Sequence, residues 1–198
     1  MDTIIKNALN FVREYFKNDV SGHDFQHTYR VYKTAIKIAE VEKNADTELV
    51  SLIALLHDVD DKKIVGSKAA DFENTGNFLT AQNISAKKIN LICSEISKIS
   101  FNGTGNTVPN TPEGKIAQDA DRIDAMGAIG IARNFAYGAS RGRAIYSEED
   151  NASSIHHFYD KLLKLEGLMN TAEGKRIARH RHQFMQNFLT EFFEEWNI

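Results

Sequence analysis

A histidine and an aspartate stand side by side, as His57 and Asp58, at the end of the apolar run 49–56. An earlier histidine, His27, and a later aspartate, Asp121, complete a His–His–Asp–Asp order along the chain. Two imidazoles and two carboxylates suit a divalent transition metal, and such a set leaves positions for water. These residue types therefore indicate a metal site with nitrogen and oxygen ligands.

The surroundings of the His57-Asp58 pair strengthen this interpretation. A charged residue directly after a fully apolar helix must be solvated, paired or bound to a metal, because an unpaired buried carboxylate is costly. The pair alone would fit an ordinary helix end. With His27 and Asp121 in the same chain, the metal site becomes the better hypothesis.

The last ligand cannot be chosen from the residues alone, because Asp119, Asp121 and Asp124 lie close together. Successive residues of a helix are about 100° apart, so Asp119 and Asp121 point to nearly opposite sides. Asp124 shares a face with Asp121. The two aspartates that do not bind the metal could instead orient its ligands.

Apolar residues recur at helical spacing almost throughout, which predicts an all-α fold. Asp46 and Ser85 are expected N-caps, and Ser21 with Asp24 has the spacing of a capping box. Glycines at 127 and 130 suggest close packing against a neighbouring backbone. Loops are expected over 101–112 and 138–151. The predicted helices cover residues 2–16, 24–43, 46–57, 70–82, 85–100, 113–137, 152–165 and 171–196.

Length and charge limit the class of protein further. The 198 residues suffice for a single domain, with a metal-site core over 21–137 and C-terminal helices over 152–196 packing on it. The net charge of −3 does not favour binding to duplex nucleic acid. A single cysteine, Cys93, excludes an internal disulfide. Neither a signal peptide nor a membrane span is expected, so the expected location is the cytoplasm.

The order of the four candidate ligands resembles the HD-domain superfamily of metal-dependent phosphohydrolases. The resemblance includes Arg30-Val31 after His27 and an Ala-Asp followed by a basic residue at 120–122. Further segments are similar to a bacterial subfamily of small stand-alone HD hydrolases. Asn102 departs from the basic residue expected there, which leaves a phosphate contact by that loop in doubt. The similar segments are 57–64, 99–101, 119–125, 127–133 and 157–162.

This resemblance implies an HD-domain helical bundle and a role for each of several residues. Asp61 would act as a base or orient water, or equally could pair with Lys63. Arg122 could instead hold a neighbouring helix, and His23 could simply begin one. The implied metal ligands are His27, His57, Asp58 and Asp121. The implied catalytic residues are Asp58, Asp61 and Lys63, and the implied substrate-binding residues are His23, Arg122, Arg133 and Lys161.

The resemblance also implies an activity and a cofactor. We expect hydrolysis of a nucleotide or another small phosphate ester or anhydride, with pyrophosphate release from nucleoside triphosphates as the most specific expectation. One divalent ion is expected, because no histidine lies between His57 and Asp121 to build a second site. Mn²⁺ is favoured, with Mg²⁺, Fe²⁺, Co²⁺, Ni²⁺ and Zn²⁺ as alternatives.

Two other classes of protein could use the same residues. A non-catalytic HD module would bind metal or nucleotide as a signalling scaffold, although such modules often lose ligands. A di-iron oxygenase would need additional ligands that the chain lacks. The aromatic residues of 184–196 are most simply core packing, but an exposed part of them could form the face of a homodimer.

Overall fold

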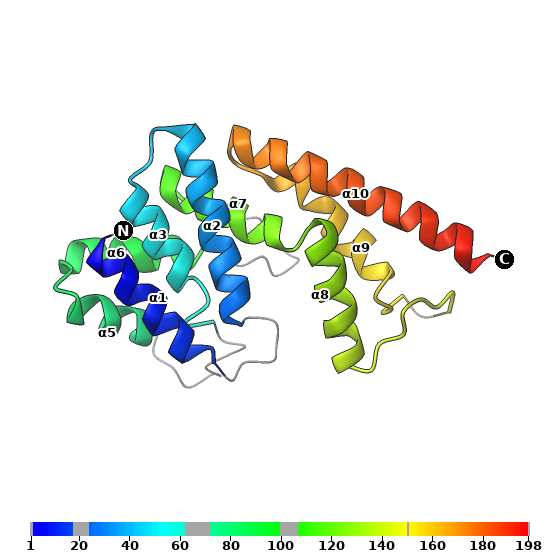
Figure 1. The fold of residues 1–198 in the computed structure, drawn as a ribbon, viewed down its shortest axis with the longest axis horizontal. Helices are drawn as coiled ribbons and strands as arrows, with labels where there is room; N and C mark the ends of the chain where they lie inside the picture. The colour runs from blue at the N-terminus through cyan, green and yellow to red at the C-terminus, as the bar shows by residue number, and fades with distance from the viewer. Residues whose placement is uncertain (1, 18–23, 62–71, 100–106, 150, 198) are drawn as a thin grey trace. The chain divides into compact units, whose positions relative to one another are not determined.

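The computed structural model describes residues 2–17, 24–61, 72–99, 107–149 and 151–197. Every regular element within these ranges is helical, which confirms the all-α fold class (Figure 1). The chain divides into two compact units, residues 1–121 and 122–198. The expectation of a single domain over 1–198 stays a prediction. None of the described helices combines the length and the apolar character needed to cross a membrane.

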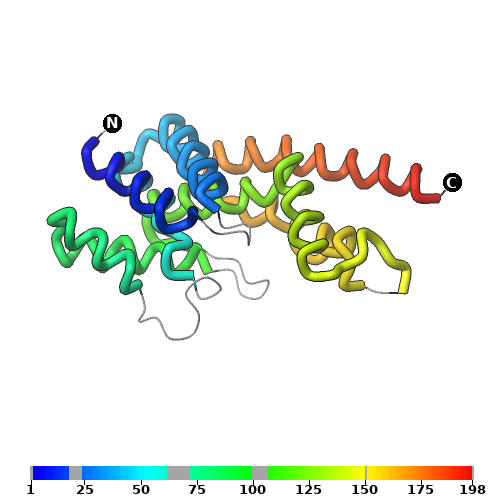
Figure 2. The backbone as a smooth tube through the Cα atoms, turned by 60° about the horizontal axis from the view of Figure 1, so that its bottom comes forward, coloured from blue at the N-terminus to red at the C-terminus, as the bar shows by residue number. Residues whose placement is uncertain are grey.

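The first unit is built around α3 (Thr47–Leu56), which packs against α1 (Thr3–Tyr15), α2 (Phe25–Glu42) and α6 (Ala86–Ile96). Figure 2 shows α1 running beside α2, and these two helices are also in contact. The short helix α5 (Glu73–Ala81) packs on α6. Helix α7 (Pro112–Asp124) begins in this unit and ends just beyond its boundary.

Helix α3 occupies the centre because its sequence is apolar on nearly every side. All residues from Leu49 to Leu56 are buried. Each buried leucine or isoleucine contributes roughly 1.5–3 kcal/mol, so rotating or sliding this helix would be very unfavourable. The Asp46 carboxylate accepts from the amides of Glu48 and Leu49, which confirms it as the N-cap. The end of α3, where His57 follows, is therefore firmly placed.

The start of α7 is held by a buried carboxylate. Thr111 Oγ1 accepts from the Gly114 amide at 3.0 Å, and Pro112 occupies the first helical position, which proline favours. Glu95 in turn accepts from the amide and the hydroxyl of Thr111, both at 2.9 Å. This chain of contacts sets the register of α7 and hence the position of the aspartates near its end.

The second unit contains α8 (Gly127–Ser140), α9 (His156–Asp160) and α10 (Ala172–Trp196), with α10 packed on α8. The predicted helix over 152–165 was wrong in most of its length, since only 156–160 is α-helical. Two 3₁₀ turns follow it, η1 (Leu162–Lys164) and η2 (Glu166–Leu168). The interruption falls at Lys161, whose φ of −134° and ψ of −57° are not helical.

The predicted continuous helix over 113–137 was also wrong, because the chain turns between α7 and α8. Gly127 has a φ of +70°, a conformation that glycine adopts without the usual steric cost. A Cβ at Gly130 would collide with the carbonyl of Ala125, so the expected close approach to backbone is confirmed there. The Arg181 guanidinium donates to the Ile123 carbonyl and so satisfies an acceptor at the end of α7.

We predict that Glu95→Ala lowers the free energy of unfolding by about 1–3 kcal/mol. The Glu95 side chain is only 1% exposed, and its removal leaves the two Thr111 donors without their acceptor. Urea unfolding measures the loss. Glu48→Ala is a matched control, because it removes only a partly exposed ion pair with Lys88 and should cost less than about 1 kcal/mol. Equal losses in the two variants would contradict this role for Glu95.

The same glutamate predicts a pH dependence of stability. Burial acts to raise the pKa of Glu95, but the Thr111 donors and Lys98 outweigh it and lower that pKa. A lowered pKa in the folded state stabilises the protein above the ordinary carboxyl pKa, and this stabilisation is lost as the pH falls. In Glu95→Gln the urea midpoint should therefore decline less steeply between about pH 7 and pH 3 than in the natural protein. Identical slopes would contradict the prediction.

Candidate metal centre

Helix α2 positions His27 in its first turn. The Asp24 carboxylate accepts from the His27 amide at 2.7 Å, so Asp24 is the N-cap of this helix. The predicted capping box assigned the cap to Ser21 and was wrong, since the helix begins one residue after Asp24. Ser21 itself lies outside the described residues. The cap fixes the start of α2, and the His27 side chain is buried.

The end of α3 positions His57 and orients its ring. Nδ1 of His57 lies 2.9 Å from the Ala54 carbonyl oxygen. A carbonyl can only accept, so this contact places a proton on Nδ1 and leaves the lone pair of Nε2 directed away from the helix. Carbonyl contacts of this kind commonly orient histidines that bind metals.

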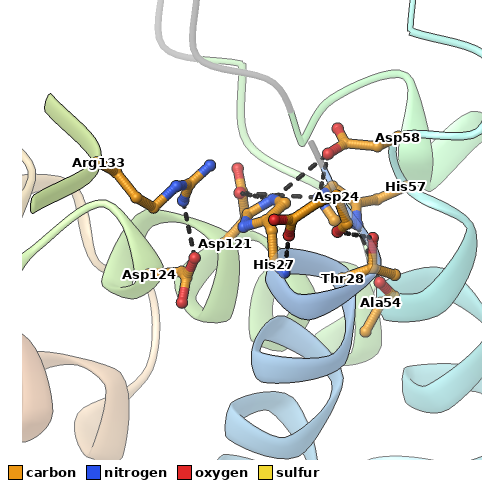
Figure 3. A network of polar contacts seen from close by, with 9 residues as sticks. All are labelled: Asp24, His27, Thr28, Ala54, His57, Asp58, Asp121, Asp124 and Arg133. Carbon is orange, nitrogen blue, oxygen red and sulfur yellow. Dashed lines mark hydrogen bonds and ion pairs between the residues drawn. The ribbon is translucent and has the colours of Figure 1, made fainter. Parts of the chain in front are cut away.

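Four donor atoms from three helical segments converge, as Figure 3 shows. Asp58 Oδ2 lies 3.3 Å from Nε2 of both His27 and His57. Asp121 Oδ1 lies 3.5 Å from Nε2 of His27 and 3.7 Å from Nε2 of His57. The donor atoms of His27, His57 and Asp121 all lie within 4.8 Å of one another. The structure thus brings together the four predicted ligands, all from the first unit.

The separations between the carboxylate oxygens and the imidazole nitrogens fit a shared ion. Ligand atoms about 2.1 Å from one metal, at angles between about 90° and 109°, are separated by about 3.0–3.4 Å. The observed separations of 3.3–3.7 Å are close to that range. Nε2 of His57 is buried and makes no hydrogen bond with any described residue. An acceptor nitrogen enclosed in this way, facing two carboxylates, is suited to a cation.

The electrostatics of the cluster also favour a cation. Burial acts to lower the pKa of His57, but Asp58 and Asp121 outweigh it and raise that pKa well above its ordinary value. Burial acts to raise the pKa of Asp121, but the interaction with His57, and then the charge of His27, lower it overall. The buried carboxylate of Asp58 and the partly exposed carboxylate of Asp121 therefore hold a positive charge at this point, which a proton or a metal ion can supply.

The aspartates near the end of α7 have different surroundings. Asp121 faces the imidazoles, and its side chain is 25% exposed. Asp124 is buried and forms an ion pair with Arg133 at 2.7 Å, shown in Figure 3. Asp119 is fully buried. Of the three, Asp121 is the aspartate that reaches the two histidines.

The remaining predicted catalytic residues are only partly described. Asp61 is half-buried, and its amide donates to the Asp58 carbonyl at 3.1 Å, so the two residues belong to one turn. Lys63 and the predicted phosphate contact His23 lie outside the described residues. The roles of these three residues stay predictions.

The three predicted cationic contacts to substrate all lie in the second unit. Arg122 is 3% exposed, and its guanidinium donates to the Leu168 carbonyl, a contact that a structural arginine makes. Arg133 pairs with Asp124. Lys161 is half-buried near His157, whose pKa is lowered by burial and then by the charges of Lys161 and Arg143. A substrate contact by any of them stays a prediction.

Several residues that shape the site were not identified from the sequence. The cap by Asp24 had a local signal, because an aspartate three residues before His27 has N-cap spacing. The contact from the Ala54 carbonyl to His57 had no signal, since it depends on the side-chain rotamer.

The half-buried thiol of Cys93 has a pKa raised by burial and then by Asp60, which disfavours the thiolate.

Comparisons with known proteins agree with this geometry. The sequence profile of the HD domain matches residues 24–126, a range that contains all four converging side chains. The Bacillus subtilis protein YpgQ is 35% identical over 183 residues, which cover 91% of this chain and 88% of that protein. This chain belongs to the HD domain family.

Solved structures extend the family relationship to nearly the whole chain. An HD-superfamily hydrolase from Bacillus thuringiensis is 38% identical with a TM-score of 0.81, over 98% of this chain and 96% of that one. Bacillus subtilis YpgQ in complex with ADP is 32% identical with a TM-score of 0.83, over 97% of this chain and 94% of that one. The fold of HD-superfamily hydrolases is thus shared over nearly the whole chain.

We predict that Asp121→Asn weakens Mn²⁺ binding by at least about tenfold to a hundredfold, because it removes a charged donor from the cluster. The matched variant Asp124→Asn should bind Mn²⁺ as the natural protein does, while losing stability because Arg133 loses its ion-pair partner. Isothermal titration calorimetry with Mn²⁺ and urea unfolding separate the two effects. Weaker binding in Asp124→Asn with unchanged binding in Asp121→Asn would reassign the ligand.

Proposed function

We propose that this protein is a divalent-metal-dependent phosphohydrolase that acts on a nucleotide. The observation that carries the proposal is the convergence of donor atoms from His27, His57, Asp58 and Asp121, with Asp58 Oδ2 3.3 Å from both imidazole nitrogens. Membership of the HD domain family supports it. The ADP complex of YpgQ supports a nucleotide as the ligand.

These four residues would hold one divalent ion through two neutral imidazoles and two carboxylates. Nitrogen and oxygen ligands of this kind suit Mn²⁺, which we favour, as well as Fe²⁺, Co²⁺, Ni²⁺ or Zn²⁺. Such an ion polarises a phosphoryl oxygen and lowers the pKa of a water molecule. The partial exposure of Asp121, at 25%, fits a centre that keeps access for water and substrate.

Asp61 is our candidate for the group that accepts or orients the water proton. The hydrogen bond from the Asp61 amide to the Asp58 carbonyl keeps Asp61 in the turn that directly follows this proposed ligand. A carboxylate at that distance along the chain can lie within reach of a water beside the centre, which general-base catalysis requires. An ion pair with Lys63 would be the competing role for this side chain.

Phosphate oxygens of a substrate also need cationic partners, because charge spreads over them during transfer. His23, Lys63 and Lys161 are candidates. Of the two arginines, Arg133 is the better one, because its side chain is 29% exposed whereas Arg122 is 3% exposed. Arg133 would have to share its charge between Asp124 and a phosphate.

The most specific form of the proposal is hydrolysis of nucleoside triphosphates with release of pyrophosphate. A homodimer would be compatible with it, through the partly exposed aromatic residues at the end of α10, where Trp196 is 48% exposed. Neither the release of pyrophosphate nor a homodimer is needed for hydrolysis at the proposed metal site.

We predict release of phosphate or pyrophosphate when metal-stripped protein is given Mn²⁺ and a panel of nucleotides and simple phosphoesters. Asp58→Ala should reduce release to the rate without protein, because it removes the proposed metal-binding carboxylate that lies beside both imidazoles. Separate assays of the two products distinguish phosphatase from pyrophosphohydrolase action. Binding of Mn²⁺ and nucleotide without product would instead show a non-catalytic binding module, and an unchanged rate in Asp58→Ala would overturn the site.

A further inference from the structure

The turn that follows His57 is anchored from two other helices. Tyr15, the last residue of α1, donates its hydroxyl to the Val59 carbonyl at 2.9 Å. Asn74, in the first turn of α5, donates from Nδ2 to the same tyrosine hydroxyl at 3.4 Å. Val59 lies directly between Asp58, a proposed ligand, and Asp60. The backbone beside Asp58 is therefore bonded to a side chain 44 residues away.

Asp60 makes the second anchor, at the start of α5. Its Oδ1 accepts from the amide and from Nδ2 of Asn74, both at 3.0 Å, and its Oδ2 accepts from the Thr75 amide at 2.9 Å. The residue in the N-cap position, Phe72, has a left-handed φ of 61° and offers no side-chain cap. The Asp60 carboxylate, rather than Phe72, accepts from the free amides at the start of α5. Its negative charge is also favourable beside the N-terminus of a helix.

Together, Tyr15, Asp60 and Asn74 form a network that fixes three consecutive residues. The Asp58 side chain is 4% exposed, Val59 is fully buried, and Asp60 is bonded to α5. The Asp58 carbonyl also accepts from the Asp61 amide at 3.1 Å. An aspartate side chain has only two rotatable bonds, so the position of the Asp58 carboxylate follows closely from the position of this backbone.

We propose that Tyr15 and Asp60 are positioning residues, which hold the turn so that Asp58 is presented to the metal in its bound orientation. The inference rests on the proposed function, since it assumes that Asp58 binds a divalent ion. Without this network the Asp58 carboxylate would have to be ordered when the metal binds, and that ordering weakens binding. Groups that orient metal ligands typically change metal affinity by about tenfold to a hundredfold when removed.

A simpler role would be to stabilise the packing of α1, α5 and the turn without affecting the metal. The chain offers a control for that role. Asn7 lies in α1, and Gln82 directly follows α5. Asn7 Nδ2 donates to Gln82 Oε1 at 2.7 Å. Asn7→Ala removes a hydrogen bond between the same two helical segments, and neither side chain is hydrogen-bonded to the turn over 58–61 in the described part of the chain.

The experiment measures Mn²⁺ affinity by isothermal titration calorimetry and stability by urea unfolding in Tyr15→Phe, Asp60→Ala and Asn7→Ala. Tyr15→Phe removes a single oxygen atom, so it tests the inference even if Asp60→Ala does not fold. We expect Tyr15→Phe and Asp60→Ala to bind Mn²⁺ about tenfold or more weakly. Asn7→Ala should lose stability yet bind Mn²⁺ as the natural protein does.

The outcomes separate this inference from the proposed function. Unchanged Mn²⁺ affinity in folded Tyr15→Phe would overturn the positioning role, while binding by the natural protein would leave the proposed metal site standing. Equal losses of affinity in Asn7→Ala and Tyr15→Phe would also overturn it, because general loosening would then explain both. No Mn²⁺ binding by the natural protein would overturn the proposed function, and the positioning role with it.

Discussion

The burial of residues 49–56 of α3 is the constraint on which the rest of the site depends. Because all residues from Leu49 to Leu56 are enclosed, the helix has one favourable rotation and one favourable depth. His57 and Asp58 follow immediately, so they are carried to the edge of the core with little freedom to choose another position. The cost of a buried carboxylate then has to be met by a positive charge. The same helix thus builds the core and creates the need for a cation beside it.

Local contacts at helix starts set the positions of the other two segments. Asp24 caps α2 just before His27, and Thr111 caps α7 ten residues before Asp121, with Glu95 holding Thr111 in turn. A cap fixes where a helix begins, and the regular rise of the helix fixes every later residue. The converging donor atoms therefore rely on polar contacts made at the starts of their helices. A metal ion shared by three segments would in turn add to the stability of this unit.

The turn over 58–61 shows how one segment can combine several roles. It contains a proposed ligand, a candidate base and, at Asp60, a carboxylate that caps a different helix. The family relationship accounts for the fold, and the range that matches the HD domain contains the four proposed ligands. The roles of Tyr15 and Asp60 follow instead from distances within this structure, and they connect packing of α1 and α5 to the chemistry at Asp58.

The sequence by itself determined the features that depend on neighbouring residues. Helical periodicity revealed the all-α class, Asp46 and Ser85 were recognisable as caps, and the order of His27, His57, Asp58 and Asp121 indicated the metal site. Only the tertiary structure decided which aspartate of α7 faces the imidazoles, because a helix presents several faces and its rotation depends on distant packing. The break before Gly127 and the short α9 also required the fold, since periodicity continues across both interruptions. The contact of Tyr15 with Val59 joins residues 44 apart, and no local pattern encodes a pairing that arises only when separate helices pack.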